Sequence, residues 1–579
     1  MCLFIKNHAR AIFCAFFVGL ITVLPQFILP LSLGVDYKGI QPLLLDDEDI
    51  YRARIHEIID GYPGVASPYF YEYKTAAVVV YPVNEWLYAL PSFIFGLSFV
   101  ITFSKFALPA LLFFLVYLFI RRLTDKKDDE PVDSELAALA GGFLVVLGYG
   151  LVDVQHVLNV LAGHADIGRI AWTRIVNPIS GAIELFAFLL LLHSAVIRNS
   201  RKAMIAAGVL LATMVGYFFS FAISVCILGV ALFAALIFRK WKELKALLII
   251  LCISIVVDIP YWYSALHAVG GIEGRALSLR NGMTFTHAPV LNKFLLATIF
   301  FVTISFIYAW VIKKDRSNKK SWILIAILLG GSMLAFNQQV ITGREIWYHH
   351  FVQYVIPLSF VSLVFALHLS VRRFFPRLWK SLMYALVILC AAWGSAASFA
   401  TISSTNDLQR HQSYAPAFDW LEQNAAKDCV VLVYSQSEEL ERYIPAFTHC
   451  DDYLSESVFG GVTKERILHN YLLKLRMDNV DSAHLREYIH ANPEKVHTFF
   501  FGDWKEMFAS GADSWVESQI PTLDIAYKNF MNSDLNTLLL KYRMDYILSS
   551  GPLPQYLLEK LPGIRLSAIT GSYEIYSFH

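Results

Sequence analysis

The chain has 579 residues, of which 56% are hydrophobic and only 16% are charged. Soluble domains average about 25% charged residues, so this composition excludes an ordinary soluble protein and indicates a polytopic membrane protein. The 48 basic and 47 acidic residues nearly cancel. We expect membrane lipids, and no nucleic acid, among the partners.

The N-terminus carries Lys6 and Arg10 ahead of an apolar run over residues 11–33. A signal peptide has a shorter apolar region and ends in a small-residue cleavage motif. This run has roughly the 20 apolar residues that a membrane-spanning helix needs, and no cleavage motif closes it. We therefore expect a retained first helix.

Apolar stretches of this length recur along the chain and predict about 11 spanning helices. The expected spans are 11–33, 105–121, 135–152, 179–197, 203–219, 220–238, 246–266, 293–312, 321–336, 351–370 and 381–400. A further crossing over residues 84–98 would move a basic loop to the opposite side of the membrane from the other basic loops. We expect that segment to form an interfacial or re-entrant helix.

The loops between these spans alternate between short, densely basic segments and longer segments with few basic residues. The positive-inside rule places the densely basic loops in the cytoplasm. The N-terminus is then cytoplasmic, and the longer loops and the C-terminal region are extracytoplasmic. We expect a multi-pass protein of the plasma (inner) membrane.

Composition divides the chain into a membrane domain over residues 1–400, with an outer loop over 35–104, and a soluble domain over 401–579. The soluble part predicts a small extracytoplasmic α/β domain, because strand-type runs and a final hairpin signal alternate with helical segments. The expected strands are 429–434, 546–549, 566–570 and 573–578.

Two cysteines, Cys429 and Cys450, lie in this soluble domain. They can form a disulfide if the domain faces an oxidising compartment. The sequence leaves this pairing open.

Four consecutive carboxylates, residues 46–49, stand soon after the first span. Acidic residues at a helix N-terminus cap free N–H groups and complement the helix dipole, which accounts for one or two of them but not for the whole run. A carboxylate in this place can act as a general base toward a hydroxyl or an amine. We expect Asp47 in that role, Asp49 as the second choice, and Glu48 in the same catalytic cluster.

Polar and basic side chains in the other outer loops can bind an anionic group near this run, because arginine and lysine pair with phosphate. The alternative is a surface role, with aromatic residues anchoring the chain at the lipid interface and arginine snorkelling. The expected binding residues are Tyr51, Arg54, Glu72, Lys74, Arg169, Arg174, Gln338, Gln339, Arg344, His349 and His350. Asp47 and Glu72 can also hold a divalent cation, Mg²⁺ or Mn²⁺, on a phosphate group.

The motif Asp47-Glu48-x-x-Tyr51, followed by Phe70-Tyr71-Glu72-Tyr73-Lys74, resembles the GT-C superfamily. These are integral-membrane glycosyltransferases that use polyprenyl-phosphate-linked sugars, such as the lipid A aminoarabinose transferases and the protein mannosyltransferases. The resemblance implies a GT-C-like membrane domain in which Asp47 is the catalytic carboxylate and Glu72 and Lys74 lie near the donor phosphate. It also implies transfer of a sugar to a lipid, glycan or protein acceptor at the outer membrane face. After Lys74 the chain departs from the aminoarabinose transferases, because Thr75-Ala76-Ala77 stands where they have prolines.

Two other classes compete with a transferase. A transporter or flippase of polyprenyl-linked lipids is expected to carry ionisable residues near the middle of its spans, and here Glu184 and Asp258 are the main ones. A non-catalytic scaffold that binds a partner through its outer domain leaves the acidic run unexplained. The sequence favours the glycosyltransferase.

Overall fold

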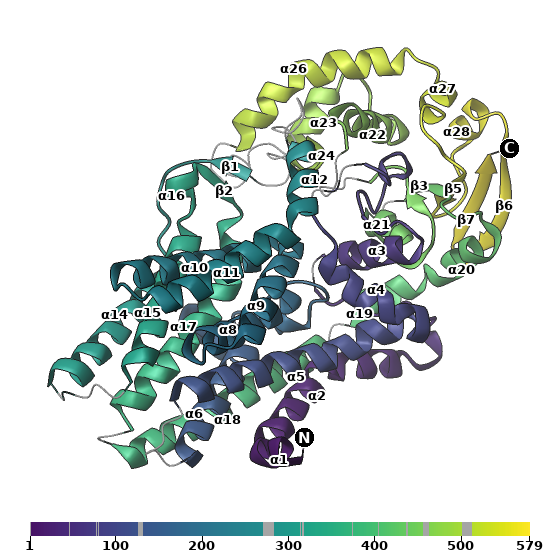
Figure 1. Cartoon of the computed structure of the whole chain (residues 1–579). Coiled ribbons are helices and arrows are strands. Elements are labelled where there is room, and N and C mark those ends of the chain that lie inside the picture. The colour runs from purple at the N-terminus through teal and green to yellow at the C-terminus, as the bar shows by residue number, and fades with distance from the viewer. Residues whose placement is uncertain are drawn as a thin grey trace.

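The computed structural model describes residues 2–45, 47–76, 78, 80–124, 131–269, 283–312, 314, 318–372, 375–402, 405–435, 438–455, 462–500 and 512–578. It consists of a helical bundle and a C-terminal α/β domain (Figure 1). The N-terminus lies at the end of the bundle that points away from the C-terminal domain. We call the opposite end, next to that domain, the domain end of the bundle.

Within the described residues, eight helices are long and apolar enough to cross a membrane. They are α2 (Ala9–Leu33), α5 (Leu97–Thr124), α8 (Ile179–Ile197), α10 (Phe218–Ile237), α14 (Lys293–Ile307), α15 (Lys319–Phe336), α17 (Tyr348–Ser370) and α18 (Pro376–Ile402). The span of α14 continues beyond the helix to Val311 and so has 19 residues. The chain is therefore a polytopic α-helical membrane protein, as its composition predicts.

The expected number of about eleven spans is too high for the part of the chain that is described. The segments α11 (Trp241–Val257) and α12 (Ile259–Val269) form a pair bent by 55°, which brings the number to nine if the pair is one span. The other two expected spans are the short helices α6 (Pro131–Val146) and α9 (Arg201–Thr213). With 16 and 13 residues at 1.5 Å each, neither alone reaches across a hydrocarbon core of about 30 Å.

A separate helix, α4 (Val83–Phe95), precedes α5, as expected for the segment 84–98. Its apolar side chains Leu87 and Ile94 are exposed, whereas Asn84 and Glu85 are buried against the protein. This inverted pattern suits a helix that lies at the lipid surface. The following span begins at Leu97 and not near residue 105, so the outer loop is shorter than expected.

The C-terminal domain is built on a five-stranded sheet with the order β4-β3-β5-β7-β6. The strands β3, β4 and β5 run parallel to one another, and β7 pairs antiparallel with both β5 and β6. The two expected strand positions that became β3 and β5 and the final hairpin are confirmed, whereas β4 was not expected. The bounds are β3 (Val430–Tyr434), β4 (Asp451–Asp452), β5 (Tyr546–Ser549), β6 (Ile564–Thr570) and β7 (Tyr573–Phe578).

Helices surround this sheet and complete the domain (Figure 1). They are α19 (Thr405–Gln412), α20 (Ala415–Asn424), α21 (Glu438–Phe447), α22 (Lys464–Met477), α23 (Leu485–Ala491), α24 (Pro493–Phe500), α26 (Ala512–Met531), α27 (Leu535–Leu539) and α28 (Gln555–Lys560). The remaining elements are α1 (Cys2–Asn7), α3 (Glu48–Ile59), α7 (Val154–Leu161), α16 (Gln339–Thr342), β1 (Met283–Phe285) and β2 (Arg344–Ile346).

The outer loop after the first span is packed into the C-terminal domain. Tyr69 and Phe70 are buried in one of its hydrophobic cores, and Ile40 is buried in another. The helix α3 packs against α21 of the domain and against α4 at the bundle, so it lies between the two parts (Figure 1). Any side chain on α3 is consequently positioned by both.

Candidate active site

Asp47 is the N-cap residue of α3 and adopts a left-handed backbone conformation, with φ of 66°. Asp and Asn tolerate this region better than other non-glycine residues. The carboxylate is 45% exposed, and its Oδ2 lies 3.4 Å from Nη1 of Arg174. Asp47 is therefore both accessible and oriented by a cation, as a catalytic carboxylate needs to be.

Glu48 occupies a different environment, because its side chain is fully buried. Nζ of Lys105 on α5 lies 2.6 and 2.9 Å from its two carboxylate oxygens. The backbone N–H groups of Leu44 and Ile175 donate to the same carboxylate. The sequence-based assignment of Glu48 to catalysis is corrected, since both of its oxygens are bound within the protein.

Asp49 faces the C-terminal domain. Its Oδ2 lies 3.3 Å from Nε of Arg442 on α21, and its carboxylate accepts a hydrogen bond from the N–H of Ile50. Burial raises the pKa of Asp49, and Arg442 opposes that shift. These contacts fit a link between α3 and the domain better than the base we expected as second choice.

Arg174 organises the cluster around Asp47. Its Nε donates a hydrogen bond of 2.6 Å to the carbonyl of Asn177, which fixes the guanidinium just before α8 begins. The guanidinium also lies 5.7 Å from the ring centre of Tyr51, one turn along α3 from Asp47. The two predicted residues Tyr51 and Arg174 thus meet Asp47, although more than 120 residues separate the loops.

The third segment of this cluster comes from α10 and α17. The hydroxyl of Tyr217, the N-cap residue of α10, lies 3.1 Å from Nδ1 of His350 in the first turn of α17. Both side chains interact electrostatically with Arg174. The ring of His350 stacks on Phe219 at 4.8 Å, and the exposed His349 lies beside it at 4.6 Å. His350 is therefore near the predicted centre, with His349 at its edge.

Tyr217 is a functional candidate that the sequence did not single out. The available signal was its place at the turn between two apolar helices, on the same side as the acidic run. The sequence could not show that this turn faces Arg174, because that depends on how α8 and α10 pack.

The segment over residues 338–344 does not form the anion-binding cradle predicted from its sequence. Nε2 of Gln338 donates to the carbonyl of Arg344, and Nε2 of Gln339 donates to the carbonyl of Ala288. Gly343 turns the chain with φ of 68°, and β2 then pairs with β1. Both amides therefore bind backbone, and the Arg344 side chain is exposed.

Three further predicted donor-binding residues are placed elsewhere. Arg54 is buried against Glu85 of α4, with Nε 2.5 Å from Oε1. Glu72 lies 3.9 Å from Nε of Arg466 in the C-terminal domain. Arg169 is exposed at the edge of a void of about 10 Å³, which has room for about one water molecule. None of these contacts brings the side chain to Asp47.

Lys74 is also corrected, because its ammonium group is buried among carboxylates. Nζ lies 2.5 Å from Glu57, 3.0 Å from Asp451 and 3.4 Å from Asp428. Burial lowers the pKa of Lys74, but Asp451 and Glu57 outweigh it and hold that pKa above its ordinary value. A lysine paired in this way is not available to a donor phosphate.

The expected cation site of Asp47 and Glu72 does not fit the structure, since each carboxylate pairs with a different arginine. Within the described ranges, one group has metal-ligand geometry, namely Cys429, His449 and Cys450. Its two cysteines are joined by a disulfide, and metals bind cysteine as the thiolate. We derive no catalytic step through a metal ion.

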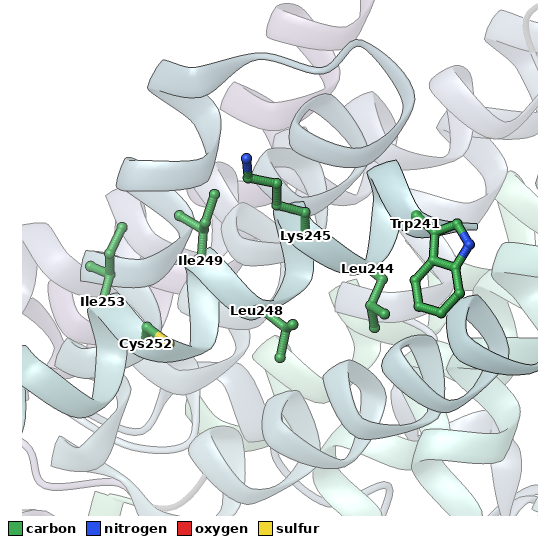
Figure 2. A pocket seen from close by; sticks show the side chains of 7 residues that line it. All are labelled: Trp241, Leu244, Lys245, Leu248, Ile249, Cys252 and Ile253. Atoms are coloured by element: carbon green, nitrogen blue, oxygen red, sulfur yellow. The ribbon is translucent and has the colours of Figure 1, made fainter. Parts of the chain in front are cut away.

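A hollow of about 450 Å³ lies on α11 (Figure 2). Its lining offers one ionisable amine and one thiol but no carboxylate or histidine, so it lacks groups for acid–base chemistry near neutral pH. The lining residues are Trp241, Leu244, Lys245, Leu248, Ile249, Cys252 and Ile253. The cluster around Asp47 is therefore the candidate active site.

No protein-family model and no curated protein matches this sequence. Among solved structures, the crystal structure of ArnT from Cupriavidus metallidurans bound to undecaprenyl phosphate is similar to the chain. It has 11% sequence identity and a TM-score of 0.46, and the match covers 97% of this chain and 98% of that one. The apo structure of the same protein has 12% identity and a TM-score of 0.44 over 97% of each chain.

Proposed function

We propose that the protein is a membrane glycosyltransferase that moves a sugar from a polyprenyl-phosphate donor to a hydroxyl or amine of a lipid, glycan or protein acceptor. The observation that carries this proposal is the accessible carboxylate of Asp47 held 3.4 Å from the Arg174 guanidinium. A base and an anion-binding group are thereby adjacent at the domain end of the bundle.

The proposed reaction inverts the configuration at the sugar C1 atom. The acceptor O–H or N–H transfers its proton to the Asp47 carboxylate as the acceptor atom bonds to C1. The bond between C1 and the donor phosphate oxygen breaks, and the polyprenyl phosphate leaves with the electron pair. Negative charge therefore develops on the phosphate, where a preorganised cation stabilises the transition state.

Three helix N-termini add to this anion-binding character. Pro178, the N-cap residue of α8, accepts a hydrogen bond of 3.3 Å from the hydroxyl of Tyr354 on α17. The contact between Tyr217 and His350 joins the N-termini of α10 and α17. Helix N-termini carry partial positive charge and favour bound phosphate. We place the donor phosphate between Arg174 and these termini.

The charges of the loops indicate how the protein is oriented in the membrane. With the densely basic loops in the cytoplasm, the domain end and the C-terminal domain are extracytoplasmic, and the lipid tail of the donor lies between spans. The plasma (inner) membrane is part of this proposal. Chelation with EDTA tests whether a divalent cation takes part in the reaction.

The transporter or flippase alternative is favoured by Glu184 on α8. This residue is buried, and its Oε2 has no hydrogen-bond partner among the described residues. Ionisable residues inside spans often mark transport pathways. A test of the function must therefore distinguish transfer of the sugar to an acceptor from movement of the lipid-linked sugar across the membrane.

The deciding experiment measures sugar transfer and release by the purified protein from a set of radiolabelled polyprenyl-phosphate sugars, with and without EDTA. We expect turnover with at least one donor and inhibition by free polyprenyl phosphate. Binding of donors without release of sugar from any of them would overturn the transferase and favour the flippase. Loss of turnover in EDTA that returns with Mg²⁺ or Mn²⁺ would restore the cation to the mechanism.

Replacing Arg174 by lysine tests the phosphate-binding role. Lysine keeps the charge but lacks the planar fork that binds Asn177, Asp47 and a phosphate together. Loss of one charge-assisted hydrogen bond, about 1.5–3 kcal/mol, corresponds to a rise in donor KM on the order of 10- to 100-fold. Steady-state kinetics with labelled donor measure it, and Arg169→Lys is the matched control at an exposed arginine outside the cluster. Equal effects at both positions would contradict the assignment.

A further inference from the structure

The buried group around Lys74 joins the outer loop, α3 and the C-terminal domain. Glu57 belongs to the last turn of α3, whereas Asp428 and Asp451 belong to the domain. All three carboxylates lie within 3.4 Å of the Lys74 ammonium. The group carries one cation for three acids, so its stability depends on that cation.

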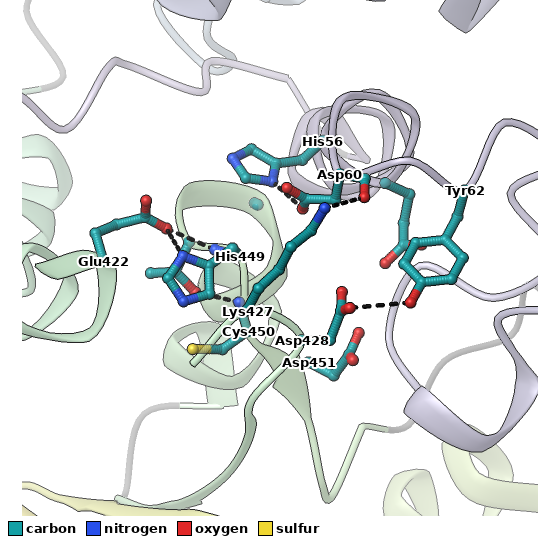
Figure 3. Close-up of polar contacts among 12 residues, drawn as sticks. His56, Asp60, Tyr62, Glu422, Lys427, Asp428, His449, Cys450 and Asp451 are labelled. Carbon is teal, nitrogen blue, oxygen red and sulfur yellow. Dashed lines mark hydrogen bonds and ion pairs between the residues drawn. The ribbon is translucent and has the colours of Figure 1, made fainter. Parts of the chain in front are cut away.

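A disulfide fixes the two acids that the domain contributes. Cys429 follows Asp428 directly, Cys450 precedes Asp451, and the two cysteines are bonded to each other. Figure 3 shows Asp428 and Asp451 side by side next to Cys450. Although 21 residues separate the cysteines in sequence, the bond holds both carboxylates at one place.

Neighbouring contacts keep the domain against α3 independently of Lys74. The hydroxyl of Tyr62 donates to Asp428 at 2.9 Å, and Nζ of Lys427 donates to the carbonyl of Asp60 (Figure 3). At the other end of α3, Arg52 donates to the carbonyl of Ala446. Loss of Lys74 would therefore loosen the C-terminal end of α3 without releasing the domain.

We propose that Lys74 is a positioning residue that anchors the C-terminal end of α3 to the disulfide-linked acids of the domain and thereby orients Asp47 toward Arg174. Glu57 and Asp47 are the two ends of one rigid element, about 15 Å apart at 1.5 Å per residue. A small rotation at Glu57 is thus transmitted to the reacting carboxylate. This role for the C-terminal domain rests on the proposed function, because it assigns Asp47 to catalysis.

Removing the Lys74 ammonium group should destabilise the packing of α3 against the domain. Lys74→Met leaves the buried Glu57 and Asp451, with the half-buried Asp428 beside them, without their shared cation, and like charges in such a site repel one another. Burial already raises the pKa of Glu57 to about 7, against the effect of Lys74. Lys74→Arg keeps the charge and restores the anchor in part.

The test compares Lys74→Met and Lys74→Arg in the full-length protein, with Lys427→Met as a matched control at a lysine of the same interface. We expect hydrogen exchange to rise in the peptide over residues 48–59 of Lys74→Met and to stay near wild type elsewhere in the membrane domain. We expect kcat to fall on the order of 10- to 100-fold, as for a misplaced reacting group, with donor KM nearly unchanged. Lys74→Arg should recover part of both effects. Lys427→Met removes only the contact with the Asp60 carbonyl and leaves the carboxylates paired with Lys74, so both of its effects should be much smaller.

Removal of the disulfide by substitution provides a second test of the anchor. The Cys429→Ser/Cys450→Ser variant should raise exchange over residues 48–59 in the same way, because Asp428 and Asp451 are no longer fixed together. Unchanged exchange in this peptide for both Lys74→Met and the serine variant would overturn the proposal. Raised exchange throughout the protein would also overturn it, since the lysine would then act only on global stability.

Failure of the proposed function would look different. Exchange over residues 48–59 would respond to Lys74→Met as expected, but no polyprenyl-phosphate sugar would be turned over by the wild-type protein. The exchange measurement therefore tests whether Lys74 anchors α3, and the turnover of the wild-type protein tests the proposed glycosyl transfer.

Discussion

Asp47→Asn should reduce sugar transfer by about 10²- to 10⁴-fold, the usual contribution of a positioned general base. Asparagine has nearly the shape of aspartate and, like aspartate, caps helix N-termini and tolerates a positive φ. The substitution therefore removes the proton acceptor and leaves α3 in place. We expect donor KM and the thermal unfolding midpoint to stay close to wild type, which kinetics with labelled donor and a melting curve measure.

The matched control is Asp49→Asn, two residues along the same helix. Because Asp49 faces Arg442 in the C-terminal domain, we expect a much smaller loss of turnover. Full turnover in Asp47→Asn together with loss in Asp49→Asn would move the base to Asp49. Equal loss in both, with lowered melting points, would point to a structural role for the whole helix start.

Lys105→Met should destabilise the protein by about 3–5 kcal/mol, the usual cost of leaving one partner of a buried ion pair uncompensated. The side chains of Lys105 and Glu48 are 1% and 0% exposed, so water cannot replace the lost cation. The free energy of unfolding in detergent measures this effect. A change below about 1 kcal/mol, typical of a surface ion pair, would contradict the structure.

The double variant Lys105→Met/Glu48→Gln separates charge from packing. It removes both charges and keeps similar side-chain volumes, and such replacements of buried pairs are often close to neutral. We expect it to recover most of the stability that Lys105→Met loses. Additive losses would show that the two residues do not interact.

Local sequence patterns were sufficient for much of the fold. The apolar runs identified the spanning helices, and the alternation of apolar strand-type runs with helices identified β3, β5 and the hairpin of β6 and β7. The lengths of the helices were predicted less well. For example, the apolar run 203–219 predicts one spanning helix, although the helix ends at Thr213. A turn inside an apolar run can be built from apolar residues, so the composition of the run does not reveal it.

The candidate site was predicted only in part. The sequence alone singled out Asp47, Tyr51, Arg174 and His350 as chemistry-bearing residues on one side of the membrane. It also attached the same expectation to Lys74, Gln338 and Gln339, whose polar groups are bound to other parts of the protein. Residue type shows what a side chain can do, but not whether its partner is a substrate or the protein itself.

The three carboxylates at the start of α3 show which properties the sequence determines and which depend on the tertiary structure. Sequence determined that Asp47, Glu48 and Asp49 stand at a helix N-terminus near a membrane. Tertiary structure decided their separate roles, because their partners Arg174, Lys105 and Arg442 come from distant segments. Glu48 and Asp49 are helix positions about 100° apart, and Asp47 is the N-cap residue with a left-handed backbone, so the three adjacent acids meet the bundle, the C-terminal domain and the open side. The acidic run is therefore visible in the sequence, whereas the acid that stays accessible is decided by which faces the other helices cover.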